Sequence, residues 1–277
     1  MQRIGLVLKR SEEQALILGE QINRFLKDCG REVLIEKTFQ GSSPNWNATF
    51  TDHIADESDL LVVLGGDGTI LRAASLLNNK PTPVLGVNLG RVGFMTEISP
   101  EEAISELKSA LEGTALLAKR MLLEITLPGG KMARVLNDVV IHWGGIARLI
   151  DLEIKIGKAR EIELRADGLI VSTPTGSSAY SYAANGPLVH PEIEGILLTP
   201  ICPYAGLKRP LLVPPYMDTE LFLRKGKTFT LTLDGHTTVN LEPGVSIRIV
   251  RASLPFIMVQ SRTRDYIDVL REKLDLV

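Results

Sequence analysis

Residues 60–69 read Leu60-Leu61-Val62-Val63-Leu64-Gly65-Gly66-Asp67-Gly68-Thr69, and the rest of the fold is predicted outward from them. The first five residues form a short, continuous apolar run, which is typical of a strand buried on both faces of a parallel sheet. After Thr69 the apolar positions follow helical spacing, since Ile70, Ala73, Ala74 and Leu77 share one face. The stretch therefore predicts a strand, a glycine turn and a helix, as in an α/β domain.

The glycine turn is a candidate phosphate site. Open α/β sheets bind their ligands beyond the carboxyl ends of the strands, which is where this turn is expected. Glycine permits positive φ and lets a ligand approach the backbone closely. Free N–H groups in the turn and at the start of the helix suit a phosphate group.

Asp67 is the unusual residue of this turn, because a carboxylate beside an anion site repels the anion. The conflict is resolved if Asp67 takes a proton from a nucleophile or holds a metal ion. A phosphate-binding turn that also carries a base is what phosphoryl transfer to a hydroxyl group needs. The alternative is that Asp67 only caps the helix by accepting the N–H of Thr69 or Ile70. In Gly-Gly-Asp-Gly-Thr after a buried strand, we favour the catalytic interpretation.

Length and composition exclude several classes of protein. The 277 residues predict one large or two ordinary domains, and 44% apolar with 23% charged residues is typical of a globular chain. A net charge of −2 gives no indication of nucleic acid or of an anionic membrane as a partner. No apolar run approaches membrane length and no signal peptide opens the sequence. Cys29 and Cys202 lack CxxC spacing, so neither a zinc site nor a disulfide framework is predicted, and we expect a cytoplasmic protein.

The order of predicted elements divides the chain near residue 117. Before it, strands at 3–9, 31–37, 60–64 and 84–87 alternate with helices, which predicts an α/β domain over residues 1–117. After it, helical periodicity nearly vanishes and short alternating stretches with turn signals follow, which predicts an all-β sandwich over residues 118–255. A last strand at 256–260 and a helix at 265–274 close the sequence. The loop Asn88–Phe94 is not GxGxxG, so the dinucleotide fingerprint is absent.

Three clusters in the β region are candidates for chemistry. Asn137-Asp138 interrupts an apolar stretch at 133–143, and a buried polar pair needs partners. For this pair alone, a bulge or turn is the favoured interpretation. Residues 165–169 and the hydroxyl-rich run 172–181 are the other two clusters, and the run suits a wall against a flat ring and a sugar, although a polar loop is the plain alternative. Asp234-Gly235-His236 is typical of a hairpin turn.

Taken together, these stretches resemble the NAD kinase family. The resemblance is carried by Gly65–Thr69, by Asn137-Asp138 and by the run from Asp167 to Tyr180, with Gly90–Phe94 and Asn185-Gly186-Pro187 similar to further family stretches in the family's order. Gly-Gly-Asp-Gly alone is shared with diacylglycerol, sphingosine and 6-phosphofructo kinases, whereas the long run is more specific. The chain departs from the family at four positions, Asp138 (Glu is also common), Ser178 (usually Thr), Asn185 (usually Gly) and His236 (often Gln).

The resemblance implies an ATP- and Mg²⁺-dependent enzyme that phosphorylates the 2′-hydroxyl of the adenosine ribose of NAD to give NADP, with Asp67 as general base. The residues implied for the ATP phosphates are Gly65, Gly66, Gly68 and Thr69. The residues implied for NAD are Asp67, Gly68, Arg72, Asn137, Asp138, Arg148, Arg165, Asp167, Ser178, Ala179, Tyr180, Ser181, Ala183 and His236. Mg²⁺ would enter on ATP, without ligands from the protein.

The resemblance also implies a fold and an assembly. The fold would be a Rossmann-like α/β domain followed by a β-sandwich, with residues 256–277 returning to the first domain. Family members are homodimers or homotetramers whose site lies between the two domains and is often completed by a neighbouring subunit. Polyphosphate as an alternative phosphoryl donor is left open by the sequence.

Two other functions remain as alternatives. A lipid kinase of the diacylglycerol or sphingosine type shares the Gly-Gly-Asp-Gly turn, but lipid binding does not explain the run Asp167–Tyr180. A non-catalytic NAD-sensing module would be expected to lose the base, whereas Asp67 is present. ATP consumption that requires added NAD distinguishes an NAD kinase from both alternatives.

Overall fold

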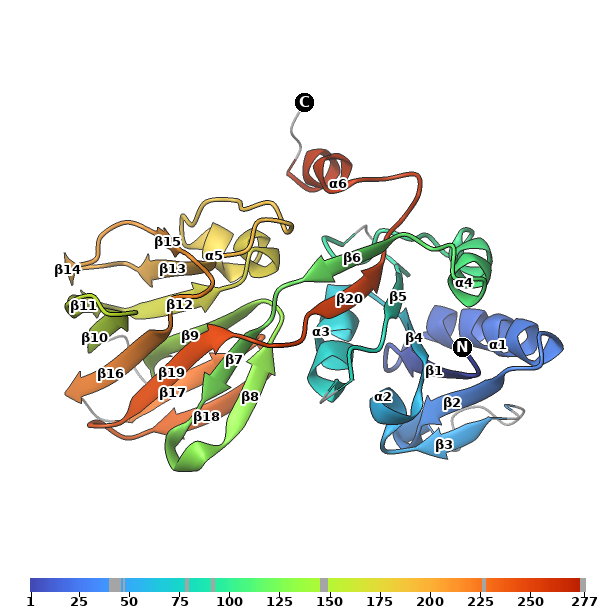
Figure 1. Ribbon diagram of the computed structural model, residues 1–277, viewed down its shortest axis with the longest axis horizontal. Helices are drawn as coiled ribbons and strands as arrows, with labels where there is room; N and C mark the ends of the chain where they lie inside the picture. Colours follow the sequence, from blue (N-terminus) through green and yellow to red (C-terminus); the bar gives the residue numbers. More distant parts are fainter. Residues whose placement is uncertain are drawn as a thin grey trace. The chain divides into compact units, whose positions relative to one another are not determined.

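The computed structural model describes residues 1–39, 46, 48–77, 80–90, 93–144, 149–225 and 228–274. The chain divides into two compact units (Figure 1). The α/β unit consists of Met1–Lys119 together with Phe256–Val277, and the β unit is Arg120–Pro255. The chain therefore leaves the α/β unit once, builds the β unit without interruption, and returns.

A seven-stranded sheet forms the centre of the α/β unit, in the order β3-β2-β1-β4-β5-β20-β6. Neighbouring strands from β3 through to β20 run parallel. The strands are β1 (Arg3–Leu8), β2 (Glu32–Glu36), β3 (Thr49–Thr51), β4 (Leu60–Leu64), β5 (Val84–Val87), β6 (Leu117–Arg120) and β20 (Phe256–Val259). β4 is buried along its whole length, as its unbroken apolar run predicts. The predicted α/β class with a parallel sheet is confirmed.

The α/β unit also contains helices, and the longer helices that pack on the sheet carry an apolar stripe at helical spacing. The helices are α1 (Glu13–Asp28), α2 (Ile54–Glu57), α3 (Asp67–Leu76), α4 (Ala103–Leu111) and α6 (Tyr266–Lys273), with a 3-10 turn η1 at Lys37–Phe39. α1 packs on β1 and β2, α3 on β1 and β4, and α4 on β5. Ile70, Ala73 and Ala74 of α3 are buried, as their spacing predicts.

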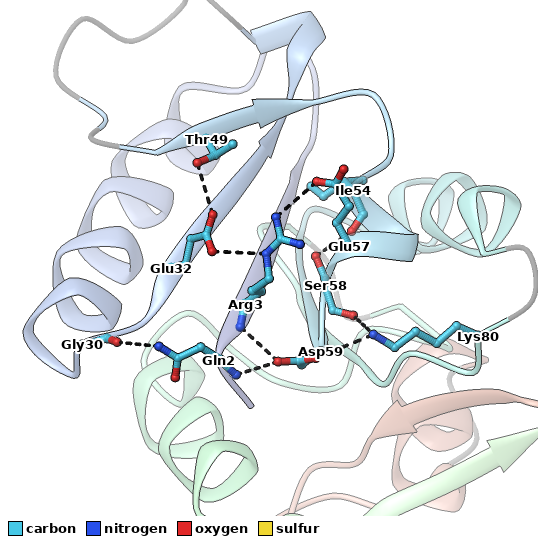
Figure 2. Close-up of polar contacts among 10 residues, drawn as sticks. All are labelled: Gln2, Arg3, Gly30, Glu32, Thr49, Ile54, Glu57, Ser58, Asp59 and Lys80. Atoms are coloured by element: carbon cyan, nitrogen blue, oxygen red, sulfur yellow. Dashed lines mark hydrogen bonds and ion pairs between the residues drawn. The ribbon is translucent and has the colours of Figure 1, made fainter.

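A polar network ties together the amino ends of the parallel strands (Figure 2). The Asp59 carboxylate, just before β4, accepts the amides of Gln2 at 2.6 Å and Arg3 at 3.1 Å. These two N–H groups lower the pKa of Asp59 below its ordinary value. Lys80 donates to Ser58 O at 2.6 Å, and Arg3 pairs with Glu32 at 3.2 Å. The network lies at the amino end of β4 and the glycine turn lies at its carboxyl end, so the polar contacts that join the strands are separate from the candidate phosphate site.

Two antiparallel sheets form the β unit, and together they are a sandwich. The first has the order β14-β11-β10-β16-β19-β7-β8 and the second has the order β15-β13-β12-β9-β17-β18. The first sheet comprises β7 (Leu123–Thr126), β8 (Met132–Val135), β10 (Ile150–Ile156), β11 (Ile162–Ala166), β14 (Ala205–Gly206), β16 (Thr219–Lys225) and β19 (Ser246–Arg251). The second comprises β9 (Asp138–Trp143), β12 (Gly168–Ser172), β13 (Ile196–Ile201), β15 (Leu211–Val213), β17 (Phe229–Leu233) and β18 (Thr237–Leu241). Helix α5 (Tyr180–Ala183) and the 3-10 turns η2 (Pro128–Gly130) and η3 (Thr175–Ser178) complete the unit.

One core fills the space between the two sheets, with Ile125, Ile154 and Leu221 contributed by the first and Ile141 and Leu231 by the second. The predicted β-sandwich is thereby confirmed. Within it, the single strand expected at 133–143 is wrong. β8 belongs to the first sheet and β9 to the second, and Leu136 and Asn137 form the corner between them. The alternative of a turn at the Asn137-Asp138 pair is thus the correct local description.

Among the described residues, none of the helices has both the length and the apolar character needed to cross a lipid bilayer.

Candidate functional site

The glycine turn lies at the carboxyl edge of the parallel sheet. β4 ends at Leu64 beside Val87, the last residue of β5, and α3 begins at Asp67 with Gly66 as its N-cap. Gly66 O accepts the amides of Thr69 at 2.8 Å and Ile70 at 3.2 Å. A helix leaves its first N–H groups without partners inside the helix, and the same end carries the positive pole of its dipole. The start of α3 is therefore suited to an anion.

The three glycines of the turn differ in what surrounds them. A Cβ at Gly65 would lie 2.3 Å from Thr69 Oγ1, so this glycine is required by packing inside the turn. A Cβ at Gly66 or Gly68 would meet no heavy atom of the described residues within 4 Å. Packing does not explain these two glycines, whereas a ligand lying against the backbone would. Open space over Gly66 and Gly68 is what a phosphate group bound by N–H groups requires.

The carboxylate of Asp67 is held by the segment that follows β5. Its Oδ2 accepts the Phe94 amide at 2.9 Å, and its Oδ1 accepts the Met95 amide at 3.0 Å and the Thr96 hydroxyl at 3.3 Å. A Cβ at Gly93 would lie 2.1 Å from Oδ1, so this segment approaches closely because residue 93 has no side chain.

The capping alternative for Asp67 is wrong, because the amides of Thr69 and Ile70 donate to Gly66 O instead. Helix capping therefore does not explain why the turn carries a carboxylate.

Arg72, an expected charge partner for NAD, is engaged within the α/β unit. Its Nη1 lies 2.6 Å from Glu36 Oε2 and its Nη2 donates to Leu8 O at 2.7 Å. The side chain thereby joins α3 to the ends of β1 and β2, and it is only a quarter exposed. The structure gives Arg72 a structural partner at the same edge as the glycine turn.

A hollow of about 360 Å³ lies on the outer face of the second sheet of the β unit. Asp138, Val140 and His142 of β9 line it at alternate positions, as expected for one face of a strand. The remaining lining residues are Asn137, Ala179, Tyr180, Thr232, Asp234 and Gly235. Four of the residues predicted for NAD are thus brought together from two distant stretches, namely Asn137, Asp138, Ala179 and Tyr180.

Two buried acceptors face this hollow without enough donors from the protein. Asn137 Oδ1 is buried and meets no donor among the described residues. Burial raises the pKa of the Asp138 carboxyl to about 7, and the nearby negative charge of Asp234 adds to the rise. Burial also raises the pKa of Asp234, although three backbone N–H groups oppose the rise. The hollow is therefore suited to a ligand that donates hydrogen bonds, such as a hydroxyl or amino group.

Sequence reasoning missed Asp234, His142 and Thr232 as lining residues. His142 Nδ1 lies 2.8 Å from Trp143 O, which leaves Nε2 as the other polar atom of the ring. Alternation along β9 is the signal that could have found His142, because residues i and i+4 of a strand share a face.

The neighbouring predicted residues have other surroundings. Ser178 donates to Thr175 O at 3.2 Å, and Ser181 is fully buried with its hydroxyl 2.8 Å from Thr199 Oγ1. Ala183 is exposed at the end of α5. His236 is exposed, and its Nδ1 lies 3.0 Å from Asp234 O in its own hairpin. These side chains support the wall of the hollow or lie beside it.

Arg165 and Asp167 are not among the residues that line the hollow. Arg165 lies 3.6 Å from Asp151 and 5.7 Å from the centre of the Tyr204 ring. Asp167 is half-buried at the start of β12, where its amide donates to Ile201 O at 3.0 Å. Arg148 lies outside the described residues.

Known proteins resemble the chain over both units. Residues 4–115 match the model of the ATP-NAD kinase N-terminal domain, and residues 136–261 match that of the ATP-NAD kinase C-terminal domain. The NAD kinase of Geotalea daltonii is 38% identical over 279 residues, covering 99% of this chain and 98% of that protein. The structure of yeast NADH kinase complexed with NADH has a TM-score of 0.91 at 25% identity, covering 99% of this chain and 88% of the other. An NAD kinase from Archaeoglobus fulgidus in complex with ATP has a TM-score of 0.78 at 26% identity, covering 98% of each chain.

Proposed function

The chain belongs to the NAD kinase family, a family of phosphotransferases, and on that premise we propose that it transfers the γ-phosphoryl group of ATP to the 2′-hydroxyl of the adenosine ribose of NAD. The products are NADP and ADP. The observation that carries the proposal is the glycine turn, where open space over Gly66 and Gly68 adjoins a carboxylate that does not cap the helix. A donor surface for phosphate and a positioned base are the two parts that this reaction needs.

The phosphates of ATP are bound by Gly65, Gly66, Gly68 and Thr69 in this proposal. The N–H groups at the start of α3 supply the donors, and the helix dipole favours the negative charge. The donor set of the turn also fits Mg²⁺ that enters on ATP, because N–H groups bind phosphate oxygens and not cations. The one carboxylate of the turn already accepts three hydrogen bonds.

Asp67 acts as the general base. A sugar hydroxyl has a pKa far above 7, so its proton leaves late in the transfer, to a carboxylate oriented on it. An ionised carboxylate offers about four lone-pair positions, and the three donors from residues 94–96 leave capacity for a substrate hydroxyl. The same three donors fix the orientation of the carboxylate, which is how a base is preorganised.

The β unit binds NAD in the hollow along β9. Asn137 Oδ1 accepts an N–H group and the Asp138 carboxylate accepts a hydroxyl, since both are buried acceptors that need donors. Ala179 and Tyr180 form the wall against which a flat ring lies. Arg165, Asp167 and Arg148 are proposed to contact NAD in an assembled homodimer or homotetramer, because the first two lie outside this hollow. Ser178, Ser181, Ala183 and His236 remain proposed as NAD-binding residues beside the hollow.

A cytoplasmic location is part of the proposal. Cys29 and Cys202 are both exposed free thiols, which suits a reducing compartment.

The test is whether the purified protein releases ADP from ATP and Mg²⁺ only when NAD is added, with NADP detected as product. NADH in place of NAD, and polyphosphate in place of ATP, define the accepted pair of substrates. A diacylglycerol or sphingosine acceptor is the control for the lipid kinase alternative. Phosphorylation of lipid without phosphorylation of NAD would overturn the proposal, and NAD binding without ADP release would favour the sensing module.

A further inference from the structure

The backbone of Leu136, Asn137 and Asp138 donates all three of its N–H groups to one side chain. Asp234 Oδ2 accepts the Leu136 amide at 2.9 Å, and Asp234 Oδ1 accepts the amides of Asn137 at 2.7 Å and Asp138 at 3.1 Å. Asp234 belongs to the turn between β17 and β18, 96 to 98 residues further along the chain. Three hydrogen bonds to a charged acceptor hold this corner of the sandwich in one geometry.

The carbonyl groups of the same three residues are also engaged. Thr173 Oγ1 donates to Leu136 O at 2.6 Å, and the Thr173 amide donates to Asn137 O at 2.9 Å. The Asp234 amide donates to Asp138 O at 3.0 Å. Two residues, Thr173 and Asp234, therefore satisfy every backbone polar group of the corner. The segment after Thr173 closes on it as well, since a Cβ at Gly176 would lie 2.2 Å from Asn137 O.

A hairpin turn does not require this chemistry. Asp234 has φ of 47°, which an Asn or a Gly would also adopt. The three bonds instead need two acceptor oxygens on one side chain, which only a carboxylate supplies. Asp234 is also buried, with 7% of its surface exposed, and burying a carboxylate is costly unless it is paired. The hairpin accounts for the positive φ of residue 234. The three hydrogen bonds from residues 136–138 account for a carboxylate at this position.

We propose that Asp234 is a positioning residue for the substrate, which fixes the corner at 136–138 so that the Asn137 and Asp138 side chains face the hollow in the geometry that binds NAD. Thr173 holds the opposite side of the same corner. The inference rests on the proposed function, because it assigns no ligand of its own. Asp234 acts through Asn137 and Asp138 and is not itself a catalytic residue.

The charge of Asp234 has a second effect that separates this role from a purely structural one. It lies beside Asp138 and helps to raise the pKa of that carboxyl. The other titratable side chains around Asp138 are His142 of β9 and Tyr180 of α5, which line the same hollow, and His236 of the β17–β18 hairpin. Replacing Asp234 by Asn removes the repulsion, so the pKa of Asp138 falls. The pH at which NAD affinity changes should then move to lower values.

Asp234→Asn is the first test variant. The Asn side chain retains one acceptor oxygen, but its amide NH2 group faces one of the three backbone N–H donors. At least one hydrogen bond to residues 136–138 is therefore lost. We expect the Kd for NAD, measured by calorimetry, to rise at least about tenfold, with the KM for ATP within about twofold of wild type. The matched control is Asp218→Asn in the same unit, because Asp218 is exposed and its ion pair among the described residues is with Arg248 at the surface. That control should leave both constants and the pH profile unchanged.

Thr173 provides the second pair of variants. Thr173→Val keeps the shape but removes the hydroxyl, whereas Thr173→Ser keeps the hydroxyl, so only the Val variant should weaken NAD binding. Amide hydrogen exchange in the wild-type protein covers the case in which a variant does not fold. The amides of residues 136–138 should exchange as slowly as those of residues 139–142 in the central strand β9.

Three results would overturn the inference. They are wild-type NAD affinity and pH profile in Asp234→Asn, equal weakening of NAD and ATP, or fast exchange of the three amides. If the wild-type protein neither binds NAD nor releases ADP when NAD is added, the proposed function is wrong. In that case hydrogen exchange still tests whether Asp234 holds residues 136–138 in one geometry. If wild type is active and Asp234→Asn behaves like Asp218→Asn, only the inference fails.

Discussion

The carboxylate of Asp67 is the group whose removal tests the chemistry directly. We expect Asp67→Asn to lower kcat by ~10²–10⁴-fold, because Asn cannot take a proton and general-base catalysis contributes about that factor. The measurement is kcat at saturating ATP, Mg²⁺ and NAD. NAD binding should change little, because the four proposed NAD residues that line the hollow, Asn137, Asp138, Ala179 and Tyr180, all belong to the β unit.

The stability of the same variant serves as the control. Asn offers one acceptor oxygen where the carboxylate uses two for the amides of Phe94 and Met95, so the Tm should fall by a few degrees. A variant that melts lower but turns over within a few-fold of wild type would show that Asp67 is a structural residue, and the mechanism would be wrong.

The raised pKa of the Asp138 carboxyl predicts that the stability of the fold depends on pH. Its carboxyl has a pKa of about 7 in the fold, against an ordinary value of 3.8, so the folded state holds this proton more tightly than the unfolded chain. The stability that this group contributes is present below its ordinary pKa and is lost as the pH rises to about 7. Asp138→Asn removes that loss. The Tm of the variant relative to wild type should therefore increase from about pH 4 to about pH 8, and parallel curves would contradict the cause.

At the scale of elements, single substitutions in the turn between β4 and α3 distinguish a glycine that packing requires from a glycine that ligand binding requires. Gly65→Ala should lower the Tm, because its Cβ would meet Thr69 Oγ1 at 2.3 Å. Gly68→Ala should leave the Tm unchanged or raise it, because the position is exposed and alanine is the better helix former. It should nevertheless raise the KM for ATP, since the added methyl group occupies the space assigned to phosphate. Unchanged ATP kinetics in Gly68→Ala would remove that assignment.

Elements with strong periodicity were predictable from the sequence. The strands at 60–64 and 84–87 have the predicted bounds, and the helix predicted at 265–274 is α6, which lies within one residue of that range at each end. β13 was missed, because Pro200 lies inside it and proline argues against a central strand. β18 was missed because most of its residues are exposed, so it lacks the alternation of a half-buried strand.

Only those parts of the candidate site that consist of neighbouring residues in the sequence could be predicted. The turn at 65–69 and the pair Asn137-Asp138 are short motifs, and both lie where a ligand can reach them. The hydrogen bonds from residues 136–138 to Asp234 join positions nearly a hundred residues apart, so no local sequence pattern predicts them. Likewise, the partners of the Asp67 carboxylate come from the segment after β5, so the sequence suggested the wrong partners within its own helix.

At the scale of the whole molecule, the division of the chain predicts how fragments behave. The fragment 120–255 contains both sheets of the sandwich and their shared core, so it should melt cooperatively alone. The fragment 1–119 lacks β20, which lies between β5 and β6, and should not fold. Joining residues 256–277 to it through a short Gly/Ser linker should restore folding, because β6 and β20 are neighbours and Gln260 donates to Leu116 O at 2.9 Å.

Circular dichroism and melting curves of the three fragments check this prediction. A folded fragment 1–119 would show that the α/β unit does not need β20, and an unfolded fragment 120–255 would show that the β unit depends on the rest of the chain.

The position of β20 in the sheet also has a consequence for synthesis on the ribosome. β5 is made early, but its neighbour β20 is made only after the 136 residues from Arg120 to Pro255. At about 5–20 residues per second this takes about 7–27 s. During that time β5 presents an unpaired edge, which is a template for pairing with other nascent chains. The β unit can complete its fold within this interval, so the half of the enzyme whose synthesis begins first is the half whose sheet is completed last.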